Sequence, residues 1–215
     1  TLFPYTTLFR SNKTLEFIDT PWVHWPETIS TFLKEDNILF SCDFFGSHLA
    51  TSDLFVEDKN EVYRAAKRYY AEIMMPFRKV IKSNLVKVNN YDIDIIAPSH
   101  GPIYDKPELI LDAYEDWTSD EVKPEVVVPY VSMHGSTEDM INYFVEKLIE
   151  KNIKVKPFNM AKMDLGDLAI SLVDASTVVL GSPTVLTGPH PLAVYVSYLA
   201  NALRPKTKYA SIIGS

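Results

Sequence analysis

The sequence lacks most features that mark secreted, membrane or nucleic-acid-binding proteins. A single cysteine, Cys42, excludes an intramolecular disulfide and suits a reducing cytoplasm. No apolar run approaches the length that spans a bilayer, and the N-terminus lacks the charged-then-apolar order of a secretion signal. The formal net charge is -7, and no basic stripe is present to displace counterions from phosphates. We therefore expect a cytoplasmic protein with no membrane and no nucleic-acid partner.

Apolar residues, in contrast, are plentiful. They make up 47% of the 215 residues, which is enough to pack the core of one large domain or two small ones. Residues 1–11 repeat Thr-Leu-Phe and resemble translated adapter sequence, so they are excluded from fold reasoning as a non-native segment. We expect the native sequence to have been cut at about Asn12.

The first half of the chain, residues 12–119, predicts sheet followed by helices. Residues 13–45 follow a strand, loop, strand pattern bounded by proline and glycine. Residues 57–88 carry apolar side chains at helical spacing, with Pro76 expected to kink or split the helix. A strand ending at Pro98 and a helix over 107–117 complete this part.

The second half changes character after a polar, charged segment, 120–125, which we interpret as an interdomain linker. Strands and helices then alternate regularly to Ser215, which predicts a parallel, doubly wound sheet. The final apolar strand has no helix after it to cover the sheet, so we expect the native domain to continue further. The predicted strands are 126–131, 155–158, 177–181 and 208–213, and the predicted helices are 138–151, 165–173 and 191–203.

Three possible metal ligands, His24, Asp43 and His100, each follow a strand-like run. Two imidazoles and one carboxylate are side chains that ligate metal ions, and their chemistry alone leaves the kind of metal open. The set is too small for a complete catalytic site. Either further ligands lie outside this sequence, or the three residues hold no metal. His48 follows Asp43 closely and is interpreted as a neighbour of the metal ligands.

A second candidate site lies between the predicted strand 126–131 and the helix after it. The loop there combines hydroxyl side chains, a glycine and a helix N-terminus, which together favour a phosphate. It lacks the lysine of a nucleotide-binding P-loop, so a monophosphate fits better; an ordinary helix cap is the alternative. A second loop, 182–189, is expected on the same rim of the sheet. The candidate residues are Ser132, Met133, His134, Gly135, Ser136 and Thr137, with Ser182, Pro183, Thr184 and Gly188.

These motifs resemble those of the flavodiiron proteins, also called A-type flavoproteins. His-Trp-Pro at His24 resembles a histidine ligand motif of that family, Asp-Phe-Phe-Gly at Asp43 its bridging aspartate motif, and Pro-Ser-His-Gly-Pro around His100 its last histidine motif. Residues 130–137 resemble its FMN phosphate loop, and residues 181–189 its flavin-ring loop. The resemblance runs from about Asn12 to the end of the chain.

The resemblance implies an α/β protein in two parts: the C-terminal part of a metallo-β-lactamase-like αββα domain over 12–119, and an incomplete flavodoxin-like domain over 126–215. It implies that His24 and His100 each bind one of two iron ions bridged by Asp43, and that the two loops bind FMN. The family's first ligand cluster would precede Asn12, and its third FMN loop would follow Ser215. We therefore expect truncation at both ends, and a chain that by itself binds iron and FMN poorly and lacks turnover.

For the full-length protein, the resemblance implies reduction of dioxygen to water or of nitric oxide to nitrous oxide. Electrons would pass through FMN from a rubredoxin-like or F420-type donor, within a head-to-tail homodimer. Two alternatives remain open at this stage. One is a zinc-dependent hydrolase on the metallo-β-lactamase scaffold. The other is a flavodoxin-type electron-transfer protein with an inert metal domain.

Overall fold

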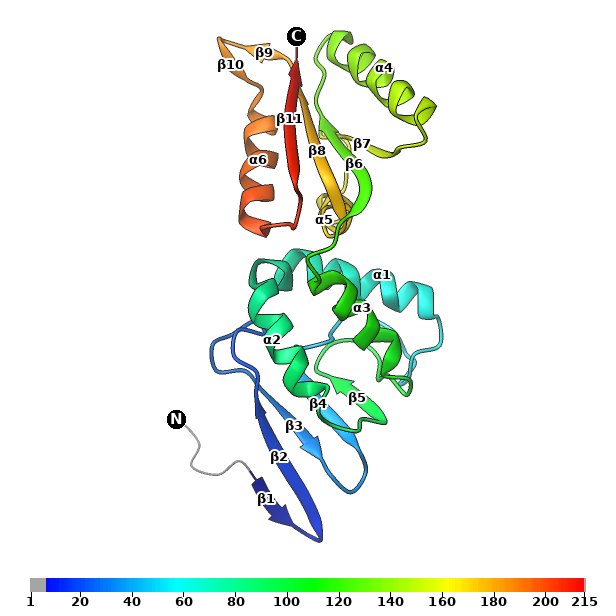
Figure 1. Cartoon of the computed structure of the whole chain (residues 1–215), viewed down its shortest axis with the longest axis vertical. Helices are drawn as coiled ribbons and strands as arrows, with labels where there is room; N and C mark the ends of the chain where they lie inside the picture. The colour runs from blue at the N-terminus through cyan, green and yellow to red at the C-terminus, as the bar shows by residue number, and fades with distance from the viewer. Residues whose placement is uncertain (1–6, 215) are drawn as a thin grey trace. The chain divides into compact units, whose positions relative to one another are not determined.

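Two separate β-sheets form the framework of the chain, one in each half (Figure 1). The computed structural model describes residues 7–214. Residues 1–6, part of the segment expected to be non-native, lie outside the described residues. Contacts divide the chain into two compact units, Thr1–Ser119 and Asp120–Ser215.

The sheet of the first unit has five strands in the order β1-β2-β3-β4-β5. Neighbours from β1 to β4 are antiparallel, whereas β4 and β5 are parallel. Side chains of β3 and β4 alternate between buried and more exposed positions, as expected for strands with one covered face. The strands are β1 Thr7–Arg10, β2 Lys13–Asp19, β3 Ile29–Leu33, β4 Ile38–Cys42 and β5 Ile95–Pro98.

Two details of this sheet differ from the sequence prediction. Residues 13–45 hold three strands, where a strand, loop, strand pattern was expected. Residues 7–10, which the sequence reasoning set aside, form the edge strand β1. A tight turn at Ser11 and Asn12 joins it to β2; both residues have positive φ, as a two-residue hairpin of right-handed twist requires.

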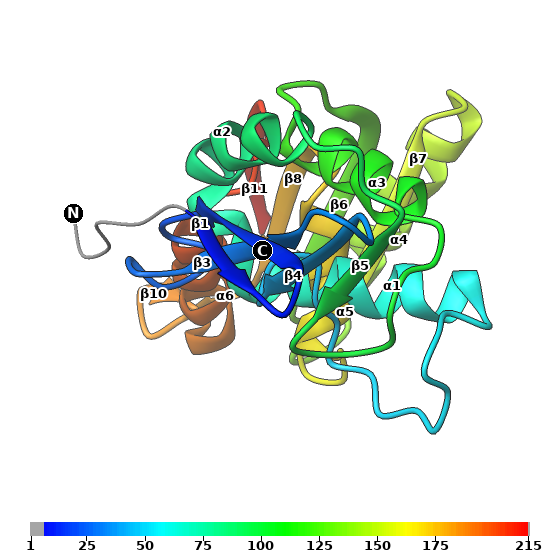
Figure 2. The ribbon, with the colours of Figure 1, turned by 90° about the horizontal axis from the view of Figure 1, so that it is seen from below.

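The helices of the first unit confirm the expected break at Pro76. Helix α1, Lys59–Tyr69, passes into a π-helical turn and a 3₁₀ turn that contains Pro76, and α2 follows at Arg78–Val88. Proline has no N–H for the α-helical ladder, so the helix changes its hydrogen-bond pattern there. Helix α3, Glu108–Thr118, packs against both α1 and α2 (Figure 2).

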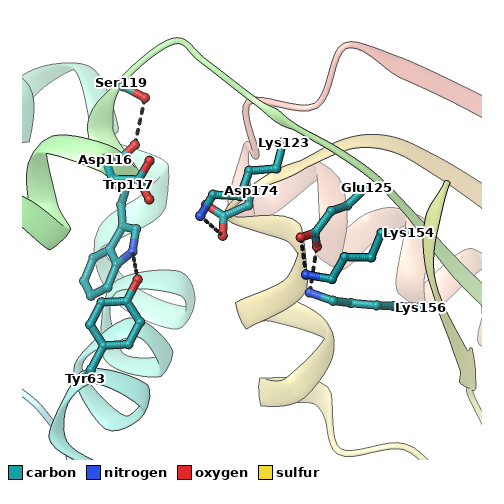
Figure 3. Close-up of polar contacts among 9 residues, drawn as sticks. All are labelled: Tyr63, Asp116, Trp117, Ser119, Lys123, Glu125, Lys154, Lys156 and Asp174. Carbon is teal, nitrogen blue, oxygen red and sulfur yellow. Dashed lines mark hydrogen bonds and ion pairs between the residues drawn. The ribbon is translucent and has the colours of Figure 1, made fainter. Parts of the chain in front are cut away.

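Aromatic side chains fill the core of this unit. Tyr70, Tyr114 and Trp117 are fully buried, with neighbouring ring centroids 5.2–5.4 Å apart. Such tilted and edge-on contacts stabilise a core beyond simple area burial. At the end of α3, the Trp117 indole donates a hydrogen bond to the Tyr63 hydroxyl over 3.3 Å (Figure 3).

The sheet of the second unit has four parallel strands in the order β11-β8-β6-β7. Numbered along this unit, that order is 4-3-1-2, with the reversal between β6 and β8. The prediction of a parallel, doubly wound sheet is therefore confirmed for these strands. They are β6 Lys123–Tyr130, β7 Lys154–Asn159, β8 Ala175–Ser182 and β11 Tyr209–Gly214.

Helices cover both faces of this sheet. In Figure 1, α4 lies on one side of the sheet and α6 on the other, with α5 packed against α6 and β6. Ile141 of α4 is fully buried against apolar residues of β6 and β8. No helix in residues 7–214 combines the length and apolar character needed to cross a membrane. The helices are α4 Ser136–Glu150, α5 Leu165–Leu172 and α6 Pro191–Leu203.

Strand β6 begins at Lys123, three residues before the predicted start, so residues 123–125 of the expected linker belong to the sheet. Ion pairs hold this start in place (Figure 3). The buried Glu125 carboxylate accepts a hydrogen bond from Lys154 at 2.5 Å and lies 2.8 Å from the Lys156 ammonium, and the Lys123 ammonium lies 3.1 Å from the Asp174 carboxylate. The charged residues that suggested a linker therefore belong to a strand, where ion pairs neutralise their charges.

Candidate functional site

Asp43 and His100 are brought together because their strands are parallel neighbours. Parallel strands open their carboxyl ends at the same edge of a sheet. Asp43 directly follows β4, and His100 stands two residues after β5. Two backbone hydrogen bonds tie the loops: Ser99 N–H donates to the Cys42 carbonyl over 2.8 Å, and Ser47 N–H donates to the His100 carbonyl over 3.0 Å. These backbone hydrogen bonds on either side of Asp43 fix the distance between Asp43 and His100.

His24 reaches the same place from the loop between β2 and β3. That loop is closed by its own hydrogen bonds: Trp22 N–H donates to the Trp25 carbonyl over 2.7 Å, and Thr28 N–H donates to the same carbonyl over 3.2 Å. The imidazole ring of His24 lies 5.6 Å from the Trp25 ring. All three candidate ligands predicted from the sequence therefore meet at one site.

The Asp43 carboxylate faces one imidazole with each of its oxygens. Asp43 Oδ2 lies 3.4 Å from His24 Nε2, and Asp43 Oδ1 lies 3.3 Å from His100 Nε2. The Asp43 side chain is 16% exposed, against 27% for His24 and 48% for His100. Within residues 7–214, no group of three or more His, Cys, Asp or Glu side chains is arranged to hold one ion. The arrangement is two His-Asp pairs that share a single carboxylate.

These distances fit one metal ion in each pair. Each imidazole nitrogen and the carboxylate oxygen that faces it could therefore hold one ion between them. The donor set is imidazole and carboxylate, which suits iron as well as zinc. Each ion would have two ligands from these residues and would need others.

His48 and Tyr69 form a wall beside His100. The His48 ring lies 5.6 Å from the His100 ring and 4.6 Å from the Tyr69 ring, edge-on in both cases. Burial, together with the nearby Asp43 carboxylate, raises the pKa of Tyr69, so its hydroxyl keeps its proton. His48 thus lies beside the ligands, where the sequence prediction put it. Tyr69 lies within the predicted helical segment 57–88, where the spacing indicates that a side chain is buried but not what it is buried against.

The two candidate phosphate loops leave adjacent strands at one edge of the second sheet. Tyr130 at the end of β6 is the partner of Gly181 in β8, and Val131 N–H donates to the Gly181 carbonyl over 3.0 Å. Loops 132–137 and 182–190 therefore begin side by side. This edge is the place where the strand order reverses, which is where open α/β sheets bind ligands.

The first loop ends at the N-terminus of α4. Gly135 has a φ of +94°, and its N–H donates to the Ser132 hydroxyl over 3.1 Å. Met133, His134 and Ser136 are exposed. N–H groups in the first turn of a helix have no partner within that helix and carry the positive end of its dipole. Backbone and hydroxyl donors around one open loop suit a phosphate group.

The second loop contains a feature that the sequence reasoning missed. Residues 184–189 form a hairpin of two short strands, β9 Thr184–Val185 and β10 Gly188–Pro189, with a turn at Leu186 and Thr187. Both turn residues have positive φ, and Leu186 is 96% exposed. Leucine and threonine rarely adopt this conformation, so no turn signal was present.

Close backbone contacts shape the base of this second loop. The Ser182 hydroxyl accepts the His190 N–H over 3.1 Å, which closes the hairpin. A Cβ on Gly181 would lie 2.7 Å from Ile141 and 2.8 Å from Tyr130, so only glycine fits there. His190 Nδ1 accepts the Leu192 N–H over 3.1 Å and so caps α6.

Comparison with known proteins defines the class of the first unit. Residues 5–101 match the model of the ODP family beta lactamase. The first unit is therefore metallo-β-lactamase-like.

The likeness to individual proteins extends over nearly the whole chain. A nitric oxide reductase from Moorella thermoacetica is 34% identical over 98% of this chain and 54% of its own length. A coenzyme F420H(2) oxidase from Methanothermobacter marburgensis is 33% identical over 94% of this chain and 52% of its own. The chain spans about half the length of the relatives it matches.

Solved structures agree with these relatives. The rubredoxin oxygen:oxidoreductase of Desulfovibrio gigas superposes with a TM-score of 0.91 at 27% identity, covering 97% of this chain and 54% of its own. The flavodiiron protein of Giardia intestinalis gives a TM-score of 0.91 at 28% identity, covering 97% and 52%. The chain is thus similar to a flavodiiron protein and to related oxidoreductases over nearly its whole length.

Proposed function

We propose that this chain is part of a flavodiiron oxidoreductase that reduces dioxygen to water or nitric oxide to nitrous oxide. The observation that carries the proposal is the Asp43 carboxylate, whose two oxygens face two different imidazoles at 3.4 and 3.3 Å. A zinc hydrolase and a flavoprotein with an inert metal domain are not favoured, because the named relatives are a nitric oxide reductase and oxidases.

In this proposal, His24, Asp43 and His100 are the residues that would hold the two iron ions, with the Asp43 carboxylate shared by both. The ions would supply the site at which a diatomic substrate is bound and reduced. The role of the protein is to fix the carboxylate between the two imidazoles, by the hydrogen bonds that join the loops after β4 and β5. The rings of His48 and Tyr69 lie beside His100 and would help to hold its imidazole in place.

The second unit is proposed as a flavodoxin-like domain that binds FMN. The strand order and the two loops at the reversal point support this assignment. Loop 132–137 would hold the phosphate with backbone and hydroxyl donors, and the loop that contains the hairpin would lie against the flavin ring. The FMN residues are Ser132, Met133, His134, Gly135, Ser136 and Thr137 for the phosphate, and Ser182, Pro183, Thr184 and Gly188 for the ring.

The assembly and the electron donor are proposals as well. A head-to-tail homodimer would place the flavin of one subunit near the irons of the other. The electron donor would be a rubredoxin-like protein or reduced F420. The names of the relatives support both kinds of donor, since one is a rubredoxin oxygen:oxidoreductase and another an F420H(2) oxidase.

The test uses the polypeptide read from the native gene, with all coding sequence that flanks these residues. Iron and FMN content are measured first, and consumption of dioxygen and of nitric oxide is then measured with a reduced donor. The proposal predicts two irons and one FMN per chain and turnover of at least one gas. Bound zinc without iron, or a protein free of flavin with no gas consumption, would contradict it.

A further inference from the structure

The turn that carries Asp43 is held in an uncommon backbone conformation. Phe45, two residues after Asp43, has a φ of +65°, a value that a bulky residue rarely adopts. Phe44 and Phe45 are both fully buried, and their rings stack at 3.9 Å. A conformation of this kind persists only where the surroundings impose it, and it is enriched at functional sites.

Two side-chain hydroxyls satisfy the buried carbonyls of this turn. The Ser41 hydroxyl donates to the Phe44 carbonyl over 2.6 Å, and the Tyr104 hydroxyl donates to the Phe45 carbonyl over 3.1 Å. Ser41 belongs to β4, so its bond is local to the turn. Tyr104 lies 59 positions further along the chain and is 1% exposed. The Tyr104 hydroxyl therefore ties the Asp43 turn to a distant segment of the chain.

Tyr104 is itself anchored to the strand that leads to His100. Tyr104 N–H donates to the Ile96 carbonyl over 2.9 Å, and Ile96 N–H donates to the Tyr104 carbonyl over 3.0 Å. Ile96 is part of β5, and His100 lies in the loop between these paired residues. Tyr104 thus holds the base of the His100 loop with its backbone and the Asp43 turn with its hydroxyl.

We propose that Tyr104 is a positioning residue that sets Asp43 between His24 and His100 by holding the Phe45 carbonyl. The effect on iron binding rests on the proposed metal centre, whereas the hydrogen bond itself is a contact within the protein. Because a buried carbonyl without a partner is costly, loss of the hydroxyl should let the turn rearrange. Burial raises the pKa of Tyr104, with the Ser47 hydroxyl opposing the shift, so the hydroxyl keeps its proton as a donor.

The test compares Tyr104→Phe with Tyr70→Phe in the polypeptide read from the native gene, with all coding sequence that flanks these residues. Both substitutions remove one buried tyrosine hydroxyl from the first unit, but the Tyr70 hydroxyl donates to the Trp117 carbonyl over 3.2 Å, away from the Asp43 turn. The first readout is amide hydrogen exchange at Gly46 and Ser47, whose N–H groups donate to the Asp43 and His100 carbonyls. The second readout is the affinity of each protein for Fe²⁺ alone, measured without oxygen.

We expect exchange at Gly46 and Ser47 to be at least about 10-fold faster in Tyr104→Phe, with other amides of the unit unchanged and Tyr70→Phe like wild type. Fe²⁺ affinity should fall about 10-fold in Tyr104→Phe alone, as for other residues that orient a metal ligand. Unchanged exchange would overturn the inference, and so would faster exchange with unchanged Fe²⁺ affinity.

The two proposals fail in different ways. Should wild type bind no Fe²⁺ while exchange in Tyr104→Phe is faster, the hold on the Asp43 turn is supported and the metal centre is contradicted. Should wild type bind Fe²⁺ while both variants match it in exchange and affinity, the metal centre is supported and the role of Tyr104 is contradicted.

Discussion

Substitution of Gly101 by alanine tests how tightly the His100 loop is packed against the loop after Asp43. Gly101 has a φ of +87°, and a Cβ built there would lie 2.1 Å from the Ser47 hydroxyl oxygen and 3.1 Å from the Ser47 carbonyl. Ser47 is almost fully buried, so it has little room to move. The substitution therefore adds both backbone strain and overpacking.

The expected cost follows from these two effects. An L-residue in the left-handed region costs about 1–2 kcal/mol, and overpacking a buried site costs about 1–3 kcal/mol. Gly101→Ala should therefore lower the free energy of unfolding of the first unit by about 2–5 kcal/mol. Since total stabilities are about 5–15 kcal/mol, this is a large fraction. With an m-value of about 2 kcal/mol/M, it corresponds to a fall of about 1–2.5 M in the urea midpoint.

Urea unfolding followed by tryptophan fluorescence is the assay, because Trp22, Trp25 and Trp117 all lie in the first unit. Gly135→Ala is the matched control: Gly135 has a φ of +94°, but a Cβ there would meet nothing within 4 Å. That control, followed by circular dichroism, should show only the strain of about 1–2 kcal/mol.

A double substitution separates the clash from the strain. Ser47→Ala removes the atom that the new Cβ meets, so Gly101→Ala should cost about 1–3 kcal/mol less in the Ser47→Ala background. The reasoning is refuted if Gly101→Ala costs no more than Gly135→Ala, or if Ser47→Ala gives no relief.

Two further predictions concern the second unit. Burial alone raises the pKa of Glu125, but the interactions with Lys154 and Lys156 outweigh burial and lower the pKa below the usual 4.5. The ionised Glu125 and its two lysines therefore stabilise the folded state above that pH. The difference in thermal stability between wild type and Glu125→Gln should shrink as pH falls below 4.5. A difference that stays constant down to pH 3 would contradict this. His190→Ala removes the cap of α6 and should cost about 1 kcal/mol in urea unfolding followed by circular dichroism; an unchanged midpoint would show that the cap contributes nothing.

Much of the candidate metal centre was predictable from the sequence, for a physical reason. Asp43 and His100 each follow a strand closely, so once β4 and β5 pair in parallel, both side chains must lie at one edge of the sheet. The loops after β6 and β8 were predictable in the same way, because regular alternation of strand and helix implies a parallel sheet.

What escaped prediction depends on contacts that leave no local signal. The hairpin at Leu186 and Thr187 uses residues that rarely adopt positive φ, so no turn motif marks it. The sequence around Tyr69 and Tyr104 indicates at most that these side chains are buried. Their contacts with His100 and with Phe45 join segments that are far apart in the chain. The start of β6 was misassigned because its charges are neutralised by partners in other segments.

The most direct test of the central claim is the number of iron ions bound per chain before and after Asp43→Asn. The measurement uses the protein read from the native gene, with Asp36→Asn as the control. Asp36 pairs with Lys13 and lies in the turn before β4, at the opposite end of that strand from Asp43. We predict two irons per chain in wild type and Asp36→Asn, and at most one in Asp43→Asn, because an amide supplies a single oxygen and no charge. Two irons retained in Asp43→Asn would contradict the assignment of Asp43 as the bridge.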